Sequence, residues 1–334
     1  MDRAFISRYW FLAALIMLIP VGILAPEPGL ALKNSGWVIP VFVGVMLGIA
    51  GFTMDTSSLV KQAANFHAVI PVLLSIYLFS PALAYGLGVW FAPAGNEHFL
   101  PAMMIMAAQA GSLASAIALT MMSGGNRELA LICTLASNSL TFLLTPFILN
   151  MSIGADVDFH VGEMMLRMLY MVLLPIAAGQ LLRPLLWART EAIRPFIRIA
   201  PQIIILMFVY TGFASGAKQL QGTPEIVLRF FAACAILHLA LLAWNYLLSG
   251  WLLFEWPDRT AIMLSGSQKT LPNGIYVWSN FFATNPYGAV PLVLYHLFQL
   301  LVDTLLVPWF EKRNLKDGES CVTATFSCHG APKR

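Results

Sequence analysis

The chain of 334 residues is strongly apolar, with 59% hydrophobic and only 10% charged residues. A soluble domain typically carries about 25% charged residues, so this composition excludes a soluble fold and indicates lipid contact over most of the length. The net charge of +3 is small. The sequence has no basic block with interleaved aromatic residues, which leaves a nucleic-acid partner without support.

Apolar runs long enough to cross a bilayer recur along almost the whole chain. A helix needs about 20 apolar residues for this. The sequence therefore predicts an all-α polytopic membrane protein, embedded in the lipid bilayer, with ten transmembrane helices near 8–26, 37–54, 66–92, 98–123, 127–150, 163–184, 198–216, 225–254, 258–283 and 287–310. The first run resembles a signal peptide, but its length favours a helix that is retained. Residues 311–334 are predicted to form a polar cytoplasmic tail that is disordered or loosely attached.

The positive charges are distributed unequally between the two sides. Only Lys33, Lys218 and Arg229 fall on one side. The side of the termini carries Arg3, Arg8, Lys61, Arg127, Arg183, Arg189, Arg194, Arg198, Arg259, Lys312, Arg313, Lys316, Lys333 and Arg334. Because positive loops stay inside, both termini are expected in the cytoplasm. Short loops favour the plasma membrane, and in particular the bacterial inner membrane. Arg167 lies near a span end and can snorkel, whereas Lys269 lies well inside the ninth span.

The two halves of the chain carry the same landmarks in the same order. Pro40 is followed by Gly51-Phe52, and Pro201 is followed at the same spacing by Gly212-Phe213. The fifth span ends LTFLLTPF (140–147) and the tenth ends VDTLLVPW (302–309). The offset equals five spans, and because five is odd the halves have opposite orientations. This predicts two inverted five-helix repeats, 1–150 and 151–310, which are typical of secondary transporters.

The same offset relates two segments that are poor continuous helix. The fourth span contains AQAGSLAS (108–115), and the ninth contains SGSQKTLPNG (265–274). Broken helices survive at membrane depth only where the freed backbone faces protein or water. Small residues also allow close helix packing, and this alternative stays open for 108–115. If both spans are broken, their half-helix N-termini would attract anions.

Polar side chains within the spans mark a candidate binding site. Lys269 at the centre of a span costs at least about 2.5–3.5 kcal/mol on insertion scales, so it needs a partner or a wet cavity. It pairs with Asp303, binds an anionic substrate, or alternates between Asp303 and the substrate. His238, Asn245, His296 and Gln299 are interpreted as hydrogen-bonded to neighbours, and a proton-carrier role is the alternative for the histidines. The candidate site residues are Ser112, Ser115, Thr134, Ser137, Asn138, Ser267, Gln268, Lys269, Thr270, Asn273 and Asp303.

Three motifs together resemble the bile acid:sodium symporter family, in its divergent branch of short members. They are AGSLASAIALTMMSGGN (110–126), LASNSLTFLLTP (135–146) and GSQKTLPNG (266–274). The resemblance implies a panel of helices within 8–54 and 163–216 and a core of helices within 66–150 and 225–310. It also implies that broken helices four and nine cross at the midplane, with substrate bound between panel and core.

The resemblance further implies two sodium ions behind the crossing. Ser115, Thr134 and Gln268 match sodium-coordinating positions. Other positions depart from the family pattern, with Ala116, Ala130, Leu264 and Ile76 standing where ligands are usual and Lys269 where a neutral residue is usual. These departures suggest that the Lys269 ammonium takes the place of a sodium ion. Sodium coupling would then be absent or restricted to a residual site at the three matching residues.

The function expected from these observations is secondary active transport of a small organic anion by alternating access. Ion or proton transport in cation homeostasis on the same fold, and conventional sodium/organic-anion symport, are the alternatives. An intramembrane enzyme would need HExxH or paired aspartates at membrane depth, and neither is present. No cofactor is expected beyond Na⁺ or H⁺ as coupling ion, and no obligate protein partner is evident.

Overall fold

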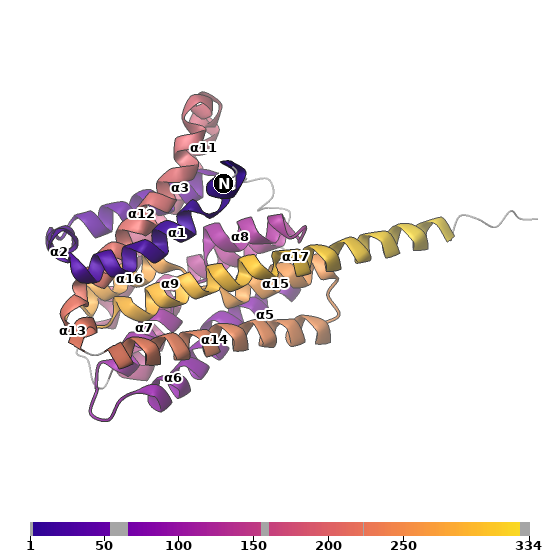
Figure 1. Ribbon diagram of the computed structural model, residues 1–334. Helices are drawn as coiled ribbons and strands as arrows, with labels where there is room; N and C mark the ends of the chain where they lie inside the picture. The colour runs from indigo at the N-terminus through magenta and orange to yellow at the C-terminus, as the bar shows by residue number, and fades with distance from the viewer. Residues whose placement is uncertain (1–2, 54–65, 155–159, 223, 328–334) are drawn as a thin grey trace, which may run out of the picture.

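The computed structural model describes residues 3–53, 66–154, 160–222 and 224–327, and every regular element in these ranges is a helix (Figure 1). The first half contains α1 (Arg3–Leu24), α2 (Glu27–Asn34), α3 (Val38–Thr53), α5 (Phe66–Leu74), η1 (Ser75–Phe79), α6 (Ser80–Phe91), α7 (Phe99–Ala107), α8 (Leu113–Met122) and α9 (Arg127–Ile153). The second half contains α10 (Val161–Met168), η2 (Leu169–Leu173), α11 (Leu174–Leu186), η3 (Trp187–Ile193), α12 (Arg194–Ser215), α13 (Ala217–Gly222), α14 (Pro224–Trp251), α15 (Trp256–Ser267), α16 (Leu271–Phe281) and α17 (Ala289–Ser327).

By length and composition, five helical segments of the described chain are able to cross a membrane, or six if α1 and α2 form one bent span. The structure is therefore that of an all-helical polytopic membrane protein. The other expected spans are short, as in α3, or interrupted, as in α7–α8 and α15–α16. The count of ten and the inverted repeat stay predictions. Among the positive charges used for orientation, Lys61, Lys333 and Arg334 lie outside the described residues.

The helices pack in two groups with a smaller set of contacts between them. In one group, α3 lies against α11, and α12 lies against α1 and α2. In the other, α14 packs on α15, α17 and α6, while α9 packs on α5, α8 and α15. The view in Figure 1 shows α1, α2, α3, α11 and α12 above α5, α6 and α14. Contacts of α16 with α3, of α12 with α17 and of α10 with α9 join the groups.

Two five-residue π-helical turns, η1 and η2, interrupt long spans. The wider π turn shifts the backbone hydrogen-bond register, and such turns are frequent at functional sites. In η1, Ser75, Ile76 and Tyr77 are buried. This turn supplies a backbone carbonyl to the site described below.

Glycines let α3 and α11 approach at backbone distance. A Cβ atom on Gly179 would lie 2.6 Å from the backbone N of Phe52 and 3.1 Å from the carbonyl carbon of Gly51. The Gln180 side chain also donates a hydrogen bond of 2.6 Å to the Gly51 carbonyl oxygen. Close backbone contact of this kind is a common way to join helices in a bilayer.

Replacing Gly179 with alanine is expected to destabilise the protein by about 1–3 kcal/mol, because the methyl group meets backbone that cannot move aside. The measurement is the apparent melting temperature of the detergent-purified protein. Gly162→Ala is the control, since nothing lies within 4 Å of its Cβ position. Equal melting temperatures for the two variants would contradict the close α3–α11 contact.

Of the two expectations for the tail, disordered or loosely attached, disorder is wrong up to Ser327. Helix α17 begins at Ala289 and continues to Ser327, beyond the predicted end of the tenth span. A helix that is already nucleated extends at little cost through Glu, Lys, Arg and Leu. Asn314 anchors the extension, since its Nδ2 donates to the Ser123 carbonyl oxygen at 2.6 Å and its Oδ1 accepts from Thr260 at 3.3 Å. Residues 328–334 of the predicted tail lie outside the described residues.

Candidate functional site

The two interrupted helices meet at their breaks. Helix α7 ends and α8 begins on either side of 108–112, and α15 and α16 flank 268–270. The backbone N–H of Thr270 donates a hydrogen bond of 2.9 Å to the carbonyl oxygen of Ala110, so one break is bonded directly to the other. Both segments are buried. We call this junction the crossing.

Local sequence explains why the helices stop here. Pro272 stands in the first turn of α16, where it needs no hydrogen-bond donor. The proline would clash with the carbonyl four residues earlier if α15 continued through it. At the other break, a Cβ atom on Gly111 would lie 3.0 Å from the Ser265 carbonyl oxygen and 3.3 Å from Ile76. Glycine is therefore required for the close approach.

The N-termini of α8 and α16 are open toward the crossing. Ser112 and Thr270 occupy the N-cap positions with extended backbone, and neither makes a side-chain capping bond. The first backbone N–H groups of both half-helices are thus without a side-chain cap, and they carry partial positive charge.

Lys269 is 2% exposed and is held by backbone oxygens. Its Nζ donates to the carbonyl oxygen of Ile76 at 2.8 Å and to that of Gln109 at 3.1 Å. Asp303 makes its hydrogen bonds elsewhere. Of the alternatives for Lys269, the standing pair with Asp303 is therefore wrong within the described residues. The sequence suggested it because Asp303 is the only acidic residue well inside another span, but this carboxylate faces a different partner.

A polar stripe on α17 holds the second break. Its three side chains, Tyr295, Gln299 and Asp303, are spaced four residues apart and so share one helix face. Tyr295 donates to the carbonyl oxygen of Ser267 at 2.6 Å. Gln299 accepts from the backbone N–H of Lys269 at 2.8 Å and donates to its carbonyl oxygen at 3.0 Å. One helix face thus satisfies the freed backbone of the break.

Asp303 links α14 to the crossing. Its Oδ1 lies 3.0 Å from Nε2 of His238, and both side chains are fully buried. Its Oδ2 accepts from Nε2 of Gln268 at 2.6 Å. Ser115 donates to the Oε1 of Gln268 at 2.6 Å, and the hydroxyls of Ser112 and Ser115 are 2.6 Å apart. The chain of bonds passes through Ser115, which is half-buried, and ends at Ser112.

Helix α9 holds the first break. Asn138 donates to the Gly111 carbonyl oxygen at 2.8 Å, and the hydroxyl of Ser137 accepts from the Gly111 N–H at 3.3 Å. Asn273 donates to Asn138 at 3.3 Å and so joins α16 to α9. Thr134 instead donates within its own helix, at 2.8 Å and 3.1 Å.

The structure thus brings most of the predicted site residues together at the crossing. Ser115 and Gln268 of the expected residual sodium site are in direct contact, whereas the Thr134 hydroxyl is bonded within α9. Some buried polar atoms here have no hydrogen-bond partner among the described residues and retain capacity for a polar solute. They are Gln109 Oε1, Ser265 Oγ, Ser267 Oγ and Asn273 Oδ1.

Sequence reasoning missed the roles of Gln299, His238 and Tyr295. The sequence interpretation of Gln299 is only that of a polar residue bonded to a neighbour, that of His238 adds a proton carrier as the alternative, and Tyr295 is not among the candidate residues. The four-residue spacing of Tyr295, Gln299 and Asp303 is a signal that could have found the stripe. It does not reveal which helix the stripe faces.

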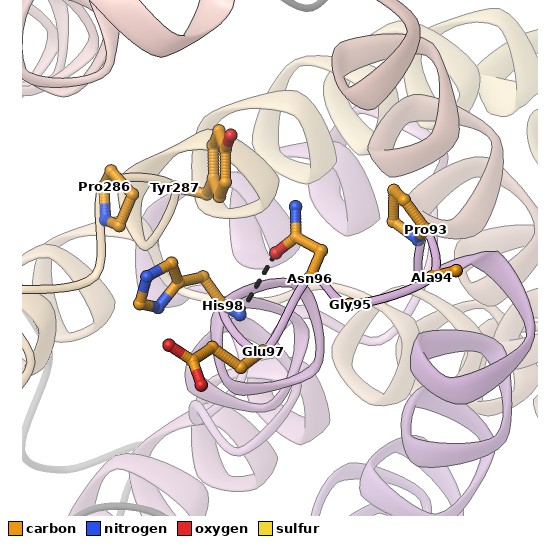
Figure 2. A pocket seen from close by; sticks show the side chains of 8 residues that line it. All are labelled: Pro93, Ala94, Gly95, Asn96, Glu97, His98, Pro286 and Tyr287. Carbon is orange, nitrogen blue, oxygen red and sulfur yellow. Dashed lines mark hydrogen bonds between the residues drawn. The ribbon is translucent and has the colours of Figure 1, made fainter.

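A separate surface pocket of about 450 Å³ lies away from these residues (Figure 2). It is lined by the connection between α6 and α7, at 93–98, and by Pro286 and Tyr287 before α17. Within its wall, the backbone N–H of His98 donates to Asn96 at 3.1 Å, drawn as a dashed line in Figure 2. No residue of the crossing lines this pocket, and the crossing is therefore the candidate functional site.

Comparison with known proteins identifies the family. Residues 9–312 match the model of the SBF-like CPA transporter family, which covers the helices and both breaks. The chain belongs to this family. An SBF-like chain is a membrane transporter rather than a soluble protein, and the resemblance carried by the three sequence motifs is confirmed.

Relatives of this SBF-like chain align along most of their length. An uncharacterized protein of Pseudomonas aeruginosa is 27% identical over 316 residues, which cover 91% of this chain and 93% of the relative. Sodium/bile acid cotransporter 7 of Mus musculus is 23% identical over 319 residues, or 92% of this chain and 93% of the relative. The probable sodium/metabolite cotransporter BASS4 of Arabidopsis thaliana, a chloroplastic protein, is 25% identical over 337 residues, or 96% and 77%.

Proposed function

We propose that this chain is a secondary active transporter that moves a small organic anion by alternating access and does not depend on sodium. The observation that carries the proposal is Lys269, a basic side chain buried at the crossing beside two half-helix N-termini without side-chain caps. Partial positive charge at helix N-termini and a lysine at the same depth together favour an anionic group.

Alternating access follows from the proposed architecture. In this proposal ten spans form two inverted repeats, 1–150 and 151–310, and the crossing lies near the midplane. The group containing α1, α3, α11 and α12 would be the panel, and the group containing the crossing would be the core. The sparser contacts between the groups support a movement of one against the other. The proposal places both termini in the cytoplasm and the protein in the plasma membrane, as a bacterial inner-membrane protein.

The residues at the crossing do not fit the two sodium ions of the wider family. Sodium is a hard cation that requires oxygen ligands. Leu264, at the position expected to hold a carboxylate, instead packs with Leu119, Met263, Val307 and Phe310. Ile76 and Ala130 belong to a second apolar cluster. Lys269 Nζ meanwhile donates to two backbone carbonyls, an arrangement in which a cationic group takes oxygen contacts that a metal ion would otherwise use.

A second candidate function, ion or proton transport in cation homeostasis, is favoured by the buried His238–Asp303 pair. Flux that needs no organic solute would distinguish it from anion transport. The cotransporter names of the relatives agree with movement of a solute.

The test is uptake of labelled organic anions into proteoliposomes, with sodium or choline as the external cation. We expect uptake of at least one anion, at the same rate in both salts and above the rate in protein-free liposomes. Uptake that requires sodium would overturn sodium independence. Ion flux without uptake of any anion in a broad panel of carboxylates, sulfonates and phosphates would favour the second candidate.

A further inference from the structure

The buried pair of His238 and Asp303 has no role in the anion transport proposed above. Both side chains are fully buried, and Nε2 of His238 lies 3.0 Å from Oδ1 of Asp303. The other carboxylate oxygen accepts a hydrogen bond of 2.6 Å from Gln268 at the crossing. Both oxygens therefore accept, as an ionised carboxylate does, which assigns the hydrogen of the neutral imidazole to Nε2.

The second ring nitrogen of His238, Nδ1, faces a hydroxyl group that can accept a hydrogen bond but already donates its own hydrogen to another acceptor. Nδ1 lies 3.4 Å from the hydroxyl oxygen of Tyr295. That hydroxyl donates its hydrogen to the carbonyl oxygen of Ser267 at 2.6 Å. In a neutral imidazole, Nδ1 is an acceptor and would face another acceptor. When Nδ1 binds a proton, it becomes a donor to the Tyr295 oxygen, and both ring nitrogens are satisfied.

We propose that His238, paired with Asp303, is the proton-binding site of this transporter and that its proton is the coupling ion for the anion. This inference rests on the proposed function. One proton adds to Nδ1 of neutral His238, and no covalent bond between heavy atoms forms or breaks. When the proton leaves, the Tyr295 hydrogen turns to Nδ1 and releases the Ser267 carbonyl. Because Ser267 is the last residue of α15, the protonation state is transmitted to the break.

The charges at the crossing agree with this coupling. With Lys269 taken as an ammonium, as in the proposed function, and with the proton bound, Lys269 and His238 are positive and Asp303 is negative, so the three groups sum to one positive charge. Without it they sum to zero. A low-dielectric interior penalises a net charge strongly, so the loaded site favours an anion of one negative charge and the empty site does not. One proton would move with each anionic charge.

Other titratable groups face this region and do not replace the pair. On α17, His296 Nδ1 lies 3.0 Å from the Gln299 amide and contacts no carboxylate. On α14, Cys234 donates to the Pro291 carbonyl oxygen at 3.6 Å. On η1, the Tyr77 hydroxyl donates to the Ser137 carbonyl oxygen at 2.5 Å. The charged groups of α15 lie in its first turns and belong to Asp258 and Arg259, while the exposed Tyr85 lies on α6.

The test is the charge displacement that follows a sudden fall in pH, recorded from proteoliposomes on a solid-supported membrane without sodium and without any organic anion. The probe is the proton itself. We expect a signal from the wild-type protein that is about tenfold smaller in His238→Gln, because the protonated nitrogen is removed. His296→Gln, a buried histidine of the same region, is the control and is expected to keep the signal. An unchanged signal in His238→Gln, or an equal loss in His296→Gln, would overturn the proposal.

A second variant tests the same proposal if His238→Gln does not fold, as judged by gel filtration and melting temperature. Tyr295→Phe removes the oxygen that accepts from Nδ1 and is expected to weaken proton binding by about tenfold while leaving the maximal signal intact. Unaltered proton binding in this variant would overturn the proposal.

Measurement of anion uptake distinguishes a failure of the proton site from a failure of the proposed function. Uptake together with a pH response that ignores His238 overturns the proton site and leaves the anion transporter standing. A pH response that depends on His238, in a protein that moves no anion, supports the proton site and overturns the choice of solute.

Discussion

Replacing Lys269 with alanine is expected to lower the apparent melting temperature by roughly 5–10 °C. The variant leaves the carbonyl oxygens of Ile76 and Gln109 without their donor at a buried position. Buried acceptors without partners cost about 1–3 kcal/mol each, so the expected loss of stability for the two carbonyls is about 2–6 kcal/mol. The measurement is thermal unfolding of the purified protein in detergent, in sodium chloride and in choline chloride.

The salt comparison tests the role of the lysine as a built-in substitute for an ion. Wild-type protein is expected to melt at the same temperature in both salts. Lys269→Ala is expected to regain part of its stability in sodium chloride, because a sodium ion can then occupy the two carbonyl oxygens. Lys312→Ala, an exposed position on α17, is the control for loss of a positive charge. If sodium clearly stabilised the wild-type protein, a cation site would survive, and Lys269 would be free to bind the solute.

The positions of the breaks could be predicted from the sequence because their causes are local. Pro272 and the small polar residues around it are incompatible with continuous helix, and Gly111 with its neighbours marks the other break. Long apolar runs likewise predict membrane helices without knowledge of their packing. The structure has half-helices on either side of both breaks, joined by the Thr270–Ala110 backbone bond.

The partners of the buried charges could not be predicted, because they depend on how each helix is rotated about its axis. By sequence, Asp303 is one candidate partner of Lys269, because it is the only acidic residue well inside another span. In the structure α17 turns Asp303 toward His238 and Gln268, while Lys269 reaches the π-helical turn at Ile76. Every residue carries a backbone carbonyl, so the sequence does not show which carbonyl accepts a hydrogen bond from a buried side chain.

The residual sodium site shows the same limit. Thr134 matches a sodium-binding position of the family by sequence, yet its hydroxyl donates to carbonyls of its own helix. Ser115 and Gln268 do meet, but they are bonded to one another. A match of residue type fixes which oxygens are present. It does not fix which rotamer the side chain adopts, because the rotamer depends on the hydrogen-bond partners that lie within reach.

Replacing Gln299 with leucine is expected to destabilise the protein by about 2–4 kcal/mol. Gln299 is fully buried, and its amide bonds both the N–H and the C=O of Lys269. Leucine has a similar volume but neither donor nor acceptor, so two buried backbone groups at the break lose their partner at once. The break would then lose the contact that fixes the Lys269 backbone, and anion uptake is expected to fall with the melting temperature.

Gln221→Leu is the matched control for this substitution. The Gln221 side chain donates one hydrogen bond of 2.7 Å, to the Ile23 carbonyl oxygen, at an exposed position where water can replace it. The free energy of unfolding of the control variant is therefore expected to lie within about 0.5 kcal/mol of the wild-type value, as it usually does for surface substitutions. A Gln299→Leu protein as stable as Gln221→Leu would mean that the break does not depend on the stripe of α17. If Gln299→Leu had normal stability but no anion uptake, Gln299 would instead be a contact of the solute. The amide would then matter only for the bound solute and not for the stability of the break.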